Sequence, residues 1–146
     1  MHVLLNDTID IDAPPEVVWS VWSDVERWPE WTASIAQIDL LEPGPLRAGI
    51  RARVRQPKLP TAVWTVTSIA PPKGFVWVSK SPGARVTGFH HIEPHGRGSR
   101  VELGVRFEGP IAWLVGWLTR GLSQRYLRLE ATGLKARSET LAISNE

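Results

Sequence analysis

The residues with the clearest capacity for chemistry are three histidines and an acid close together in the chain, His90, His91, Glu93 and His95. Imidazole and carboxylate groups are common ligands of transition metals. His90 and His91 are neighbours in an expected strand, however, so their side chains point to opposite faces of the sheet. His95 follows in a glycine-containing turn. We therefore expect no metal site here.

His90 is the candidate for acid–base chemistry. It shares its strand parity with Ile92, so we expect both side chains to point into the apolar interior. An inward imidazole can orient a ligand carbonyl, or act as an acid or base near neutral pH. The plainer alternative is a histidine that forms a hydrogen bond on the inner face of the sheet. His90 is thus the one candidate catalytic residue.

Motifs of several common enzyme classes are absent. The chain has no Cys, which excludes a disulfide, a thiolate nucleophile and a Cys-based metal site. It also has no G-x-S-x-G elbow, P-loop, G-x-G-x-x-G or H-E-x-x-H motif. We expect no cofactor.

The sequence also bears on location. The N-terminus has no basic segment before an apolar run, so we expect no signal peptide. No apolar stretch reaches the length of about 18 residues expected of a membrane-spanning helix. With the absence of Cys, these features predict a cytoplasmic protein without stable membrane insertion.

Charge is unevenly distributed, although the net charge is only +2. Residues 1–42 carry nine acids and one base, whereas residues 43–146 carry six acids and sixteen bases. The two segments either contact each other and offset their charges, or leave a basic patch for an anionic ligand, a membrane or nucleic acid. We favour the first interpretation and expect a monomer or homodimer that binds no nucleic acid.

Hydrophobic periodicity predicts the elements that must position these side chains. A half-buried strand over 3–12 is followed by two short helices, over 15–22 and 25–31, the second interrupted by Pro29. Six further strands are expected over 35–41, 50–56, 62–69, 75–80, 85–92 and 100–108. Pro- and Gly-rich turns separate them, which is typical of an antiparallel meander.

A Pro-free stretch follows the last expected strand. Over 111–139 apolar residues recur at helical spacing, which predicts one helix roughly 40 Å long. Leu114, Leu118 and Leu122 are expected to face the sheet, with Trp113 and Trp117 beside them. Two interior glycines cost about 1 kcal/mol each relative to Ala. We expect the tail from 140 to fray.

The run from Val17 to Trp31, VVWSVWSDVERWPEW, resembles the signature helix pair of the polyketide cyclase/dehydratase and lipid-transport proteins of the START-like (SRPBCC) superfamily. Weaker matches follow in the family's order at 49–53, 64–66, 71–72, 75–77, 92–94 and 98–101. The resemblance spans essentially the whole chain and implies a single START-like domain over 1–146. Its fold is α+β, the helix-grip fold: a curved seven-stranded antiparallel sheet, two short N-terminal helices and one long C-terminal helix.

The resemblance also implies a ligand site between the sheet and the long helix. In the family's register, strand 50–56 directs Ala52, Val54 and Gln56 inward and Arg51, Arg53 and Arg55 outward. The outward arginines form a solvated face or a phosphate-binding stripe, of which we favour the first. The polar residues expected to point inward are His90, Gln56 and Arg125. The residues expected to contact a ligand are Trp28, Trp31, Val54, Gln56, Trp64, Phe75, Trp77, His90, Phe107, Leu114, Trp117 and Leu118.

Tryptophan is unusually frequent, with eight Trp against one Tyr and three Phe. Trp19 and Trp22 are expected to pack in the core. The resemblance places Trp28 and Trp31 near the pocket mouth. With Trp64, Trp77 and Trp117 they either line an aromatic cavity for a ring-containing ligand or fill that space themselves.

Three functions are compatible with these features. The first is a binding protein for a small hydrophobic molecule, lipid-like or aromatic and polyketide-like, anchored by one or two polar groups. The second is an enzyme of the polyketide cyclase/dehydratase type with His90 as its acid or base. The third is a protein-interaction domain whose pocket is vestigial. Fold alone does not choose among them.

Overall fold

The computed structural model describes residues 2–144, which form one seven-stranded sheet with helices before and after its last six strands. The elements are β1 (His2–Ile11), α1 (Pro15–Trp22), η1 (Val25–Glu30), β2 (Gln37–Leu40), β3 (Arg51–Arg55), β4 (Ala62–Ala70), β5 (Gly74–Ser81), β6 (Ala84–His95), β7 (Gly98–Glu108), α2 (Pro110–Leu118) and α3 (Arg120–Ser144). The strand order is β1-β7-β6-β5-β4-β3-β2, with every neighbouring pair antiparallel. The expected α+β helix-grip fold is confirmed.

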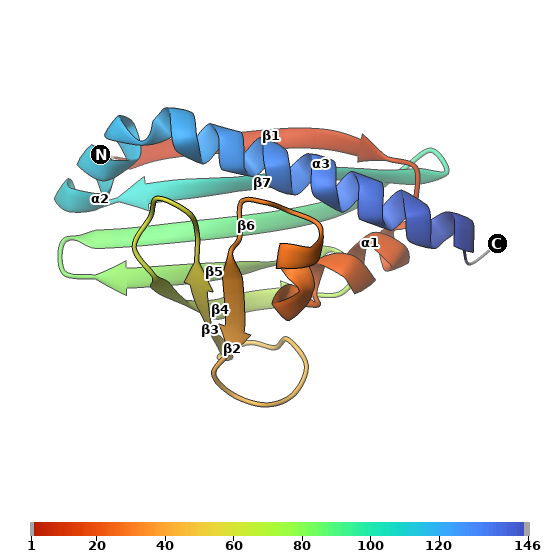
Figure 1. Ribbon diagram of the computed structural model, residues 1–146, viewed down its shortest axis with the longest axis horizontal. Helices are drawn as coiled ribbons and strands as arrows, with labels where there is room; N and C mark the ends of the chain where they lie inside the picture. Colours follow the sequence, from red (N-terminus) through yellow and green to blue (C-terminus); the bar gives the residue numbers. More distant parts are fainter. Residues whose placement is uncertain (1, 145–146) are drawn as a thin grey trace.

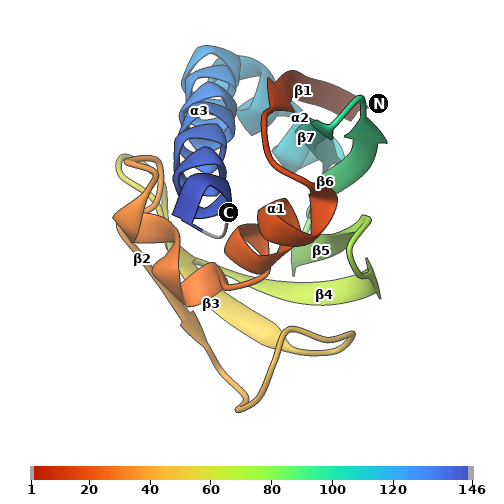
Figure 2. The same ribbon diagram turned by 90° about the vertical axis from the view of Figure 1, so that its right-hand side faces the viewer.

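The sheet curves around α3. Figure 1 shows α3 lying across the sheet along β1 and β7 and running toward α1 at the opposite end from α2. In the view of Figure 2 the strands wrap from β1 round to β2, with α3 and α1 on the concave side. The helices, with α3 the longest of them, therefore cover a strongly curved apolar face.

The helix pair between β1 and β2 forms as its sequence predicts. Pro15 occupies the first turn of α1, where its missing N–H leaves no hydrogen bond unmade. Val18, Val21 and Trp22 form the buried side of α1. Pro29 lies inside the second helix, which adopts the tighter 3₁₀ form as η1. This pair closes one end of the curved sheet.

The strands match the predicted ones, with longer β6 and β7. These two strands continue until only Gly96 and Arg97 separate them, so the turn expected between residues 92 and 100 is shortened to two residues. On β6, His90 is buried and His91 is exposed, as predicted from parity. Ala52 and Val54 of β3 are likewise buried, and the three arginines of that strand are exposed. The register of β4 shifts after Val66.

The long C-terminal helix is confirmed as α3, but the prediction that it is one continuous helix from residue 111 is wrong. The helical segment is interrupted at Thr119, whose φ of −101° and ψ of 12° depart from helical values, and this separates α2 from α3. The expectation that Leu114 and Leu118 face the sheet is also wrong, because they are 48% and 64% exposed. Ala112 and Gly116 are the buried residues of α2 instead.

The packing of α2 on the sheet explains why Trp117 is exposed. Gly116 lies so close to Phe107 that an added Cβ would be 2.5 Å from its ring, so a small residue must face the sheet there. Trp117 is therefore directed outward and is 49% exposed.

On α3 the buried residues are Leu127, Glu130, Ala131, Leu134 and Ser138. Arg125 does not share their side of the helix and is exposed, contrary to expectation. The helix also continues to Ser144, past the predicted start of a frayed tail, whose residues 145 and 146 lie outside the described part. None of the helices in residues 2–144 has the length and apolar character needed to cross a bilayer.

Candidate functional site

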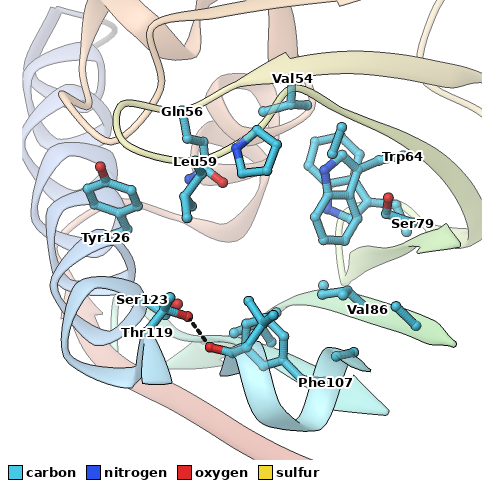
Figure 3. Close-up of a pocket in the computed structure, with 18 of the residues that line it drawn as sticks. Val54, Gln56, Leu59, Trp64, Ser79, Val86, Phe107, Thr119, Ser123 and Tyr126 are labelled. Carbon is cyan, nitrogen blue, oxygen red and sulfur yellow. Dashed lines mark hydrogen bonds between the residues drawn. The ribbon is translucent and has the colours of Figure 1, made fainter. Parts of the chain in front are cut away.

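A cavity of about 620 Å³ lies between the concave side of the sheet and the two C-terminal helices. This volume is within the range of roughly 300–1,000 Å³ that is typical of small-molecule sites. Figure 3 shows Ser123 and Tyr126 of α3 facing Gln56 and Leu59 across the cavity, with Trp64 and Phe107 on the sheet side. Most of the lining side chains are apolar.

The cavity has an open end and a closed end. Exposed lining residues surround the open end: Pro60, Thr61, Lys80, Ser81, Ile111 and Val115. Buried lining residues form the closed end: Trp28, Trp77, His90, Leu103 and Glu130. Beyond the closed end the interior is filled by the side chains of α1, η1 and the second half of α3. The tryptophans therefore both fill and line the interior, at different ends.

Four aromatic side chains pack around His90. Its imidazole stacks on Phe75 with 4.0 Å between ring centroids and 10° between planes. Trp22 and Trp77 meet it edge-on at 5.0 and 5.5 Å, and Trp28 is tilted against it at 5.7 Å. These rings exclude water from both faces of the imidazole. They leave its Nε2 edge directed toward α3.

One hydrogen bond fixes the tautomer of His90. Nδ1 lies 3.2 Å from the carbonyl oxygen of Phe75, and because a carbonyl only accepts, Nδ1 carries the proton and donates. Nε2 of the neutral ring is then an acceptor. Burial lowers the pKa of His90 from 6.5 to about 3, although the bond to Phe75 opposes this shift. His90 is therefore neutral at physiological pH.

Glu130 supplies the polar group on the opposite wall. Its carboxyl group projects from α3, and its Oε2 accepts a hydrogen bond of 2.9 Å from the Nε1–H of Trp22. Burial raises the pKa of Glu130 from 4.5 to about 7, although the Trp22 bond opposes this shift. Glu130 therefore exchanges its proton close to neutral pH.

Nε2 of His90 and Oε2 of Glu130 are 3.8 Å apart. Since His90 is neutral well above pH 3, the two groups do not form an ion pair near pH 7. They instead present one acceptor nitrogen and one carboxyl group that is part protonated. Such a pair can accept from and donate to a single hydroxyl group, whereas a carbonyl group can only accept from the protonated carboxyl group.

Sequence reasoning missed Glu130. The signal was present, because Glu130 is three residues after Leu127 and four before Leu134, which puts all three on one side of a helix. We took the inner stripe from Leu114, Leu118 and Leu122 instead. Because the helix is interrupted at Thr119, the leucine stripe of α2 does not determine which side of α3 faces inward.

Seven of the expected ligand-contacting residues line the cavity: Trp28, Val54, Gln56, Trp64, Trp77, His90 and Phe107. Trp28 lies at the closed end, not at the mouth where we expected it. Trp31 and Phe75 support the wall from behind, through ring contacts with Trp28 and His90 respectively. Leu114, Trp117 and Leu118 lie on the outer side of α2 and do not line the cavity, because its small residues face inward.

Two further polar contacts hold the β3–β4 loop over the cavity. The hydroxyl group of Tyr126 donates to the carbonyl oxygen of Pro57, which ties the loop to α3. Nε2 of Gln56 donates to the carbonyl oxygen of Ser34 at 3.3 Å. Gln56 thus has a structural partner, and Tyr126 is a lining residue that the sequence analysis did not identify.

Residues 2–144 contain no cluster of three His, Cys, Asp or Glu side chains placed to hold a metal ion. His95 lies on the outer surface, where its Nε2 is 3.1 Å from Arg100 and 3.8 Å from Asp10. It is far in the fold from His90, which is buried on the inner face of the same strand.

The sequence of this chain is similar to those of known proteins. A model of the family described as polyketide cyclase/dehydrase and lipid transport matches residues 2–139. A curated protein, the toxin Rv0910 of Mycobacterium tuberculosis, is 28% identical over 114 residues, which are 73% of this chain and 76% of that protein.

Solved structures share the fold. A START superfamily protein from Mycobacterium smegmatis superposes with a TM-score of 0.75 at 20% identity, over 97% of this chain and 99% of its own. The di-domain ARO/CYC StfQ from the steffimycin biosynthetic pathway gives a TM-score of 0.72 at 14% identity, over 99% of this chain and 52% of its own. At these identities the structures agree in fold.

Proposed function

The chain belongs to the polyketide cyclase/dehydrase and lipid transport family, and on that basis we propose that it is a cytoplasmic protein that binds a small, largely apolar molecule. The ligand occupies the cavity between the sheet and α3. It contains at least one ring and carries a hydroxyl or keto group at the end that enters first.

The observation that carries this proposal is the His90–Glu130 pair at the closed end of an otherwise apolar cavity. Aromatic walls favour flat rings, because offset and edge-on ring contacts add to area burial. Each group already has one hydrogen bond, His90 through Nδ1 to Phe75 and Glu130 through Oε2 from Trp22, and each can form one more. A ligand hydroxyl that donates to Nε2 of His90 and accepts from protonated Glu130 would provide both groups with a second partner.

The binding energy comes mainly from apolar burial, at roughly 25 cal/mol per Å² of surface removed from water. The polar pair then selects for orientation and for the presence of the oxygen atom. This division of roles is typical of small-molecule sites, where a few polar groups fix a pose within an apolar cavity.

A second candidate function is proton transfer of the cyclase type. It is favoured by one observation, the pKa of about 7 that burial gives Glu130. A general base is most effective when its pKa lies near the working pH. In this alternative Glu130 removes a proton from the carbon between two ligand carbonyls. His90, neutral and fixed in one tautomer, accepts a hydrogen bond from a substrate hydroxyl group at Nε2 and so orients the substrate rather than exchanging the proton.

The ligand itself is sought first by native mass spectrometry of the protein purified from its host under non-denaturing conditions. We expect a retained adduct of one small molecule per chain. Loss of that adduct in Val86→Trp, which fills part of the cavity with an indole ring, assigns it to the cavity if the fold is preserved. An adduct that survives in the variants below with unchanged occupancy would place the ligand elsewhere.

A matched probe pair tests the polar anchor. Isothermal titration calorimetry with 2-naphthol and naphthalene isolates the hydroxyl group. We expect the wild type to prefer 2-naphthol by roughly tenfold, the value of about 1.4 kcal/mol for one well-placed hydrogen bond. His90→Phe retains the stacking on Phe75 and should abolish the preference, whereas His91→Phe, on the outer face of the same strand, should retain it.

The same variants separate binding from catalysis. Exchange of the central C–H of 1-phenyl-1,3-butanedione into deuterated water is followed by NMR. An enzyme accelerates this exchange above buffer background and loses the acceleration in Glu130→Gln. A binding protein leaves the exchange at the background rate in both the wild type and Glu130→Gln, and that outcome would eliminate the cyclase alternative.

A further inference from the structure

Helix α2 has an outward apolar surface, only part of which lines the open end of the cavity. Its members are Ile111, Leu114, Val115, Trp117 and Leu118, which together we term the α2 face. Ile111 and Val115 are 56% and 44% exposed, in addition to the three residues described above. Four of the five are spaced i, i+3, i+4 and i+7, so they form one stripe along the helix. The large apolar residues thus face out and the small ones face the protein, the reverse of an ordinary surface helix.

This orientation is fixed by packing. Gly116 contacts the ring of Phe107, and the N–H of Ile111 donates to the carbonyl oxygen of Gly83 at 3.1 Å. Rotating α2 to bury its large side chains would drive them into Phe107. Contiguous exposed apolar surface of this kind usually marks an interaction site.

The α2 face has a basic rim. Lys80 and Arg85 flank the β5–β6 turn, whose Gly83 holds the start of α2, and Arg120 follows its end. Figure 1 shows α2 beside this turn at one end of the molecule. The guanidinium of Arg120 lies 4.7 Å from the ring centre of Trp117. All three basic side chains are exposed, and within residues 2–144 none forms an ion pair with a carboxylate.

We propose that the α2 face docks onto the surface of an anionic phospholipid bilayer. The apolar stripe enters the boundary between headgroups and acyl chains, and the basic rim contacts the phosphate groups. Tryptophan and arginine are suited to that boundary, because each combines an apolar body with a polar end. This inference concerns the outer surface of the protein and does not depend on which ligand occupies the cavity.

The position of the face relative to the cavity supports a lipid surface. Ile111 and Val115 belong both to the α2 face and to the open end of the cavity. A docked α2 therefore brings that opening against the bilayer. An apolar molecule dissolved in the membrane would enter the cavity without crossing bulk water.

Size and charge disfavour a second copy of the chain as the partner. A nine-residue helix is about 14 Å long and about 10 Å wide, so its face is far smaller than the roughly 800 Å² per partner of a stable interface. A twofold contact through this face would also bring Arg120 and its neighbours close to their own copies. An anionic surface instead complements them.

The test is flotation of the full chain with vesicles of phosphatidylcholine alone or with about 30% phosphatidylglycerol. We expect binding to the anionic vesicles, weakened by salt because the electrostatic part is screened. The double variant Leu114→Glu/Leu118→Glu should bind at least about tenfold more weakly. Both side chains are exposed, so the fold tolerates the change. Ile143→Glu is the control, because Ile143 is an apolar residue that is 73% exposed and lies near the C-terminal end of α3, away from α2.

Three outcomes would overturn the proposal. The wild type would remain unbound at every phosphatidylglycerol content, or Ile143→Glu would weaken binding as much as the double variant. Alternatively, sedimentation would show a dimer that the double variant abolishes, with no vesicle binding, which would identify a second copy as the partner. Titration of 2-naphthol into the double variant keeps this result separate from the function of the cavity, since its closed end is unchanged.

Discussion

Nε2 of His90 and Oε2 of Glu130 face each other across the closed end of the cavity at 3.8 Å, one from β6 and the other from α3. Burial acts on both groups by the same physical cause and favours the neutral form of each. The pKa of one falls and the pKa of the other rises. Their contributions to stability therefore have opposite pH dependence.

Glu130→Gln should remove the contribution of Glu130 to the pH dependence of the unfolding free energy. The folded-state pKa of Glu130 is raised, so its stabilising contribution is complete below pH 4.5 and is lost as pH rises to about 7. Relative to the wild type, the variant should gain about 3 kcal/mol in unfolding free energy across that interval. Urea denaturation at several pH values measures the difference.

The wild type itself should show a plateau. The pKa of His90 is lowered from 6.5 to about 3, so its contribution is complete above pH 6.5 and is lost as pH falls through the interval to about 3. Between pH 4.5 and 6.5 the contributions of His90 and Glu130 to the pH dependence of the unfolding free energy cancel, so urea denaturation of the wild type should show no net change from these two groups.

The control for Glu130→Gln is Glu102→Gln, a substitution of an exposed residue of β7. A difference between Glu130→Gln and wild type that did not vary with pH would contradict the assigned shift.

Trp22→Phe tests the hydrogen bond that holds the Glu130 carboxyl group. The Nε1–H of Trp22 donates to Oε2 at 2.9 Å and lowers the pKa that burial raises. Without this donor, the pKa of Glu130 should move above 7, as followed by carbon-13 NMR of its carboxyl carbon. Trp19→Phe, on the same helix and without a bond to Glu130, should leave the midpoint in place. Equal midpoints in both variants would show that the Trp22 bond has no electrostatic role.

Val86→Trp should block the cavity without unfolding the protein. Val86 lines the cavity on β6, and an indole ring there would occupy space that a ligand needs. We expect at least about tenfold weaker binding of 2-naphthol with the melting temperature retained. Thr87→Trp places the same ring on the outer face of the same strand. If the two variants bound 2-naphthol equally well, the probe would be binding outside the cavity.

Two glycines of α3 provide a packing test. A Cβ at Gly133 would lie 2.0 Å from the carbonyl oxygen of Trp31, whereas a Cβ at Gly121 would meet no atom within 4 Å. Gly133→Ala should therefore destabilise the protein by about 1–3 kcal/mol. Gly121→Ala should stabilise it by up to about 1 kcal/mol through helix propensity alone. Thermal unfolding of both variants gives the signs, and a stabilising Gly133→Ala would contradict the close approach of α3 to η1.

The sheet and the helix pair were predictable because their signals are local. Alternation places His90 inside and His91 outside, and Pro29 marks the irregular second helix. The interruption at Thr119 carries no Pro or Gly of its own. The side of α2 that faces the sheet is fixed by the contact between Gly116 and Phe107, which are nine residues apart and belong to different elements. Periodicity within one segment does not contain that information.

The site was predictable on the sheet side and not on the helix side. Strand parity located Val54, Trp64 and Trp77 on the inner face, where they line the cavity. Glu130 required knowledge of which side of α3 faces inward, and the strongest leucine pattern belonged to the outer side of α2. A carboxylate at an interior helical position is usually solvated, whereas this one is buried with a hydrogen bond from Trp22 and a raised pKa.

The contrast between the filled end and the open end of the interior has a consequence for divergence. The buried core lies mainly where α1, η1 and the second half of α3 close over the sheet, and the residues around the open end of the cavity, such as Pro60, Lys80 and Val115, do not belong to it. Substitutions at the open end can alter the shape of the cavity one side chain at a time, without disturbing the aromatic wall behind His90. A lineage that carries this fold can therefore acquire a new ligand preference before it has to find a new way to fold.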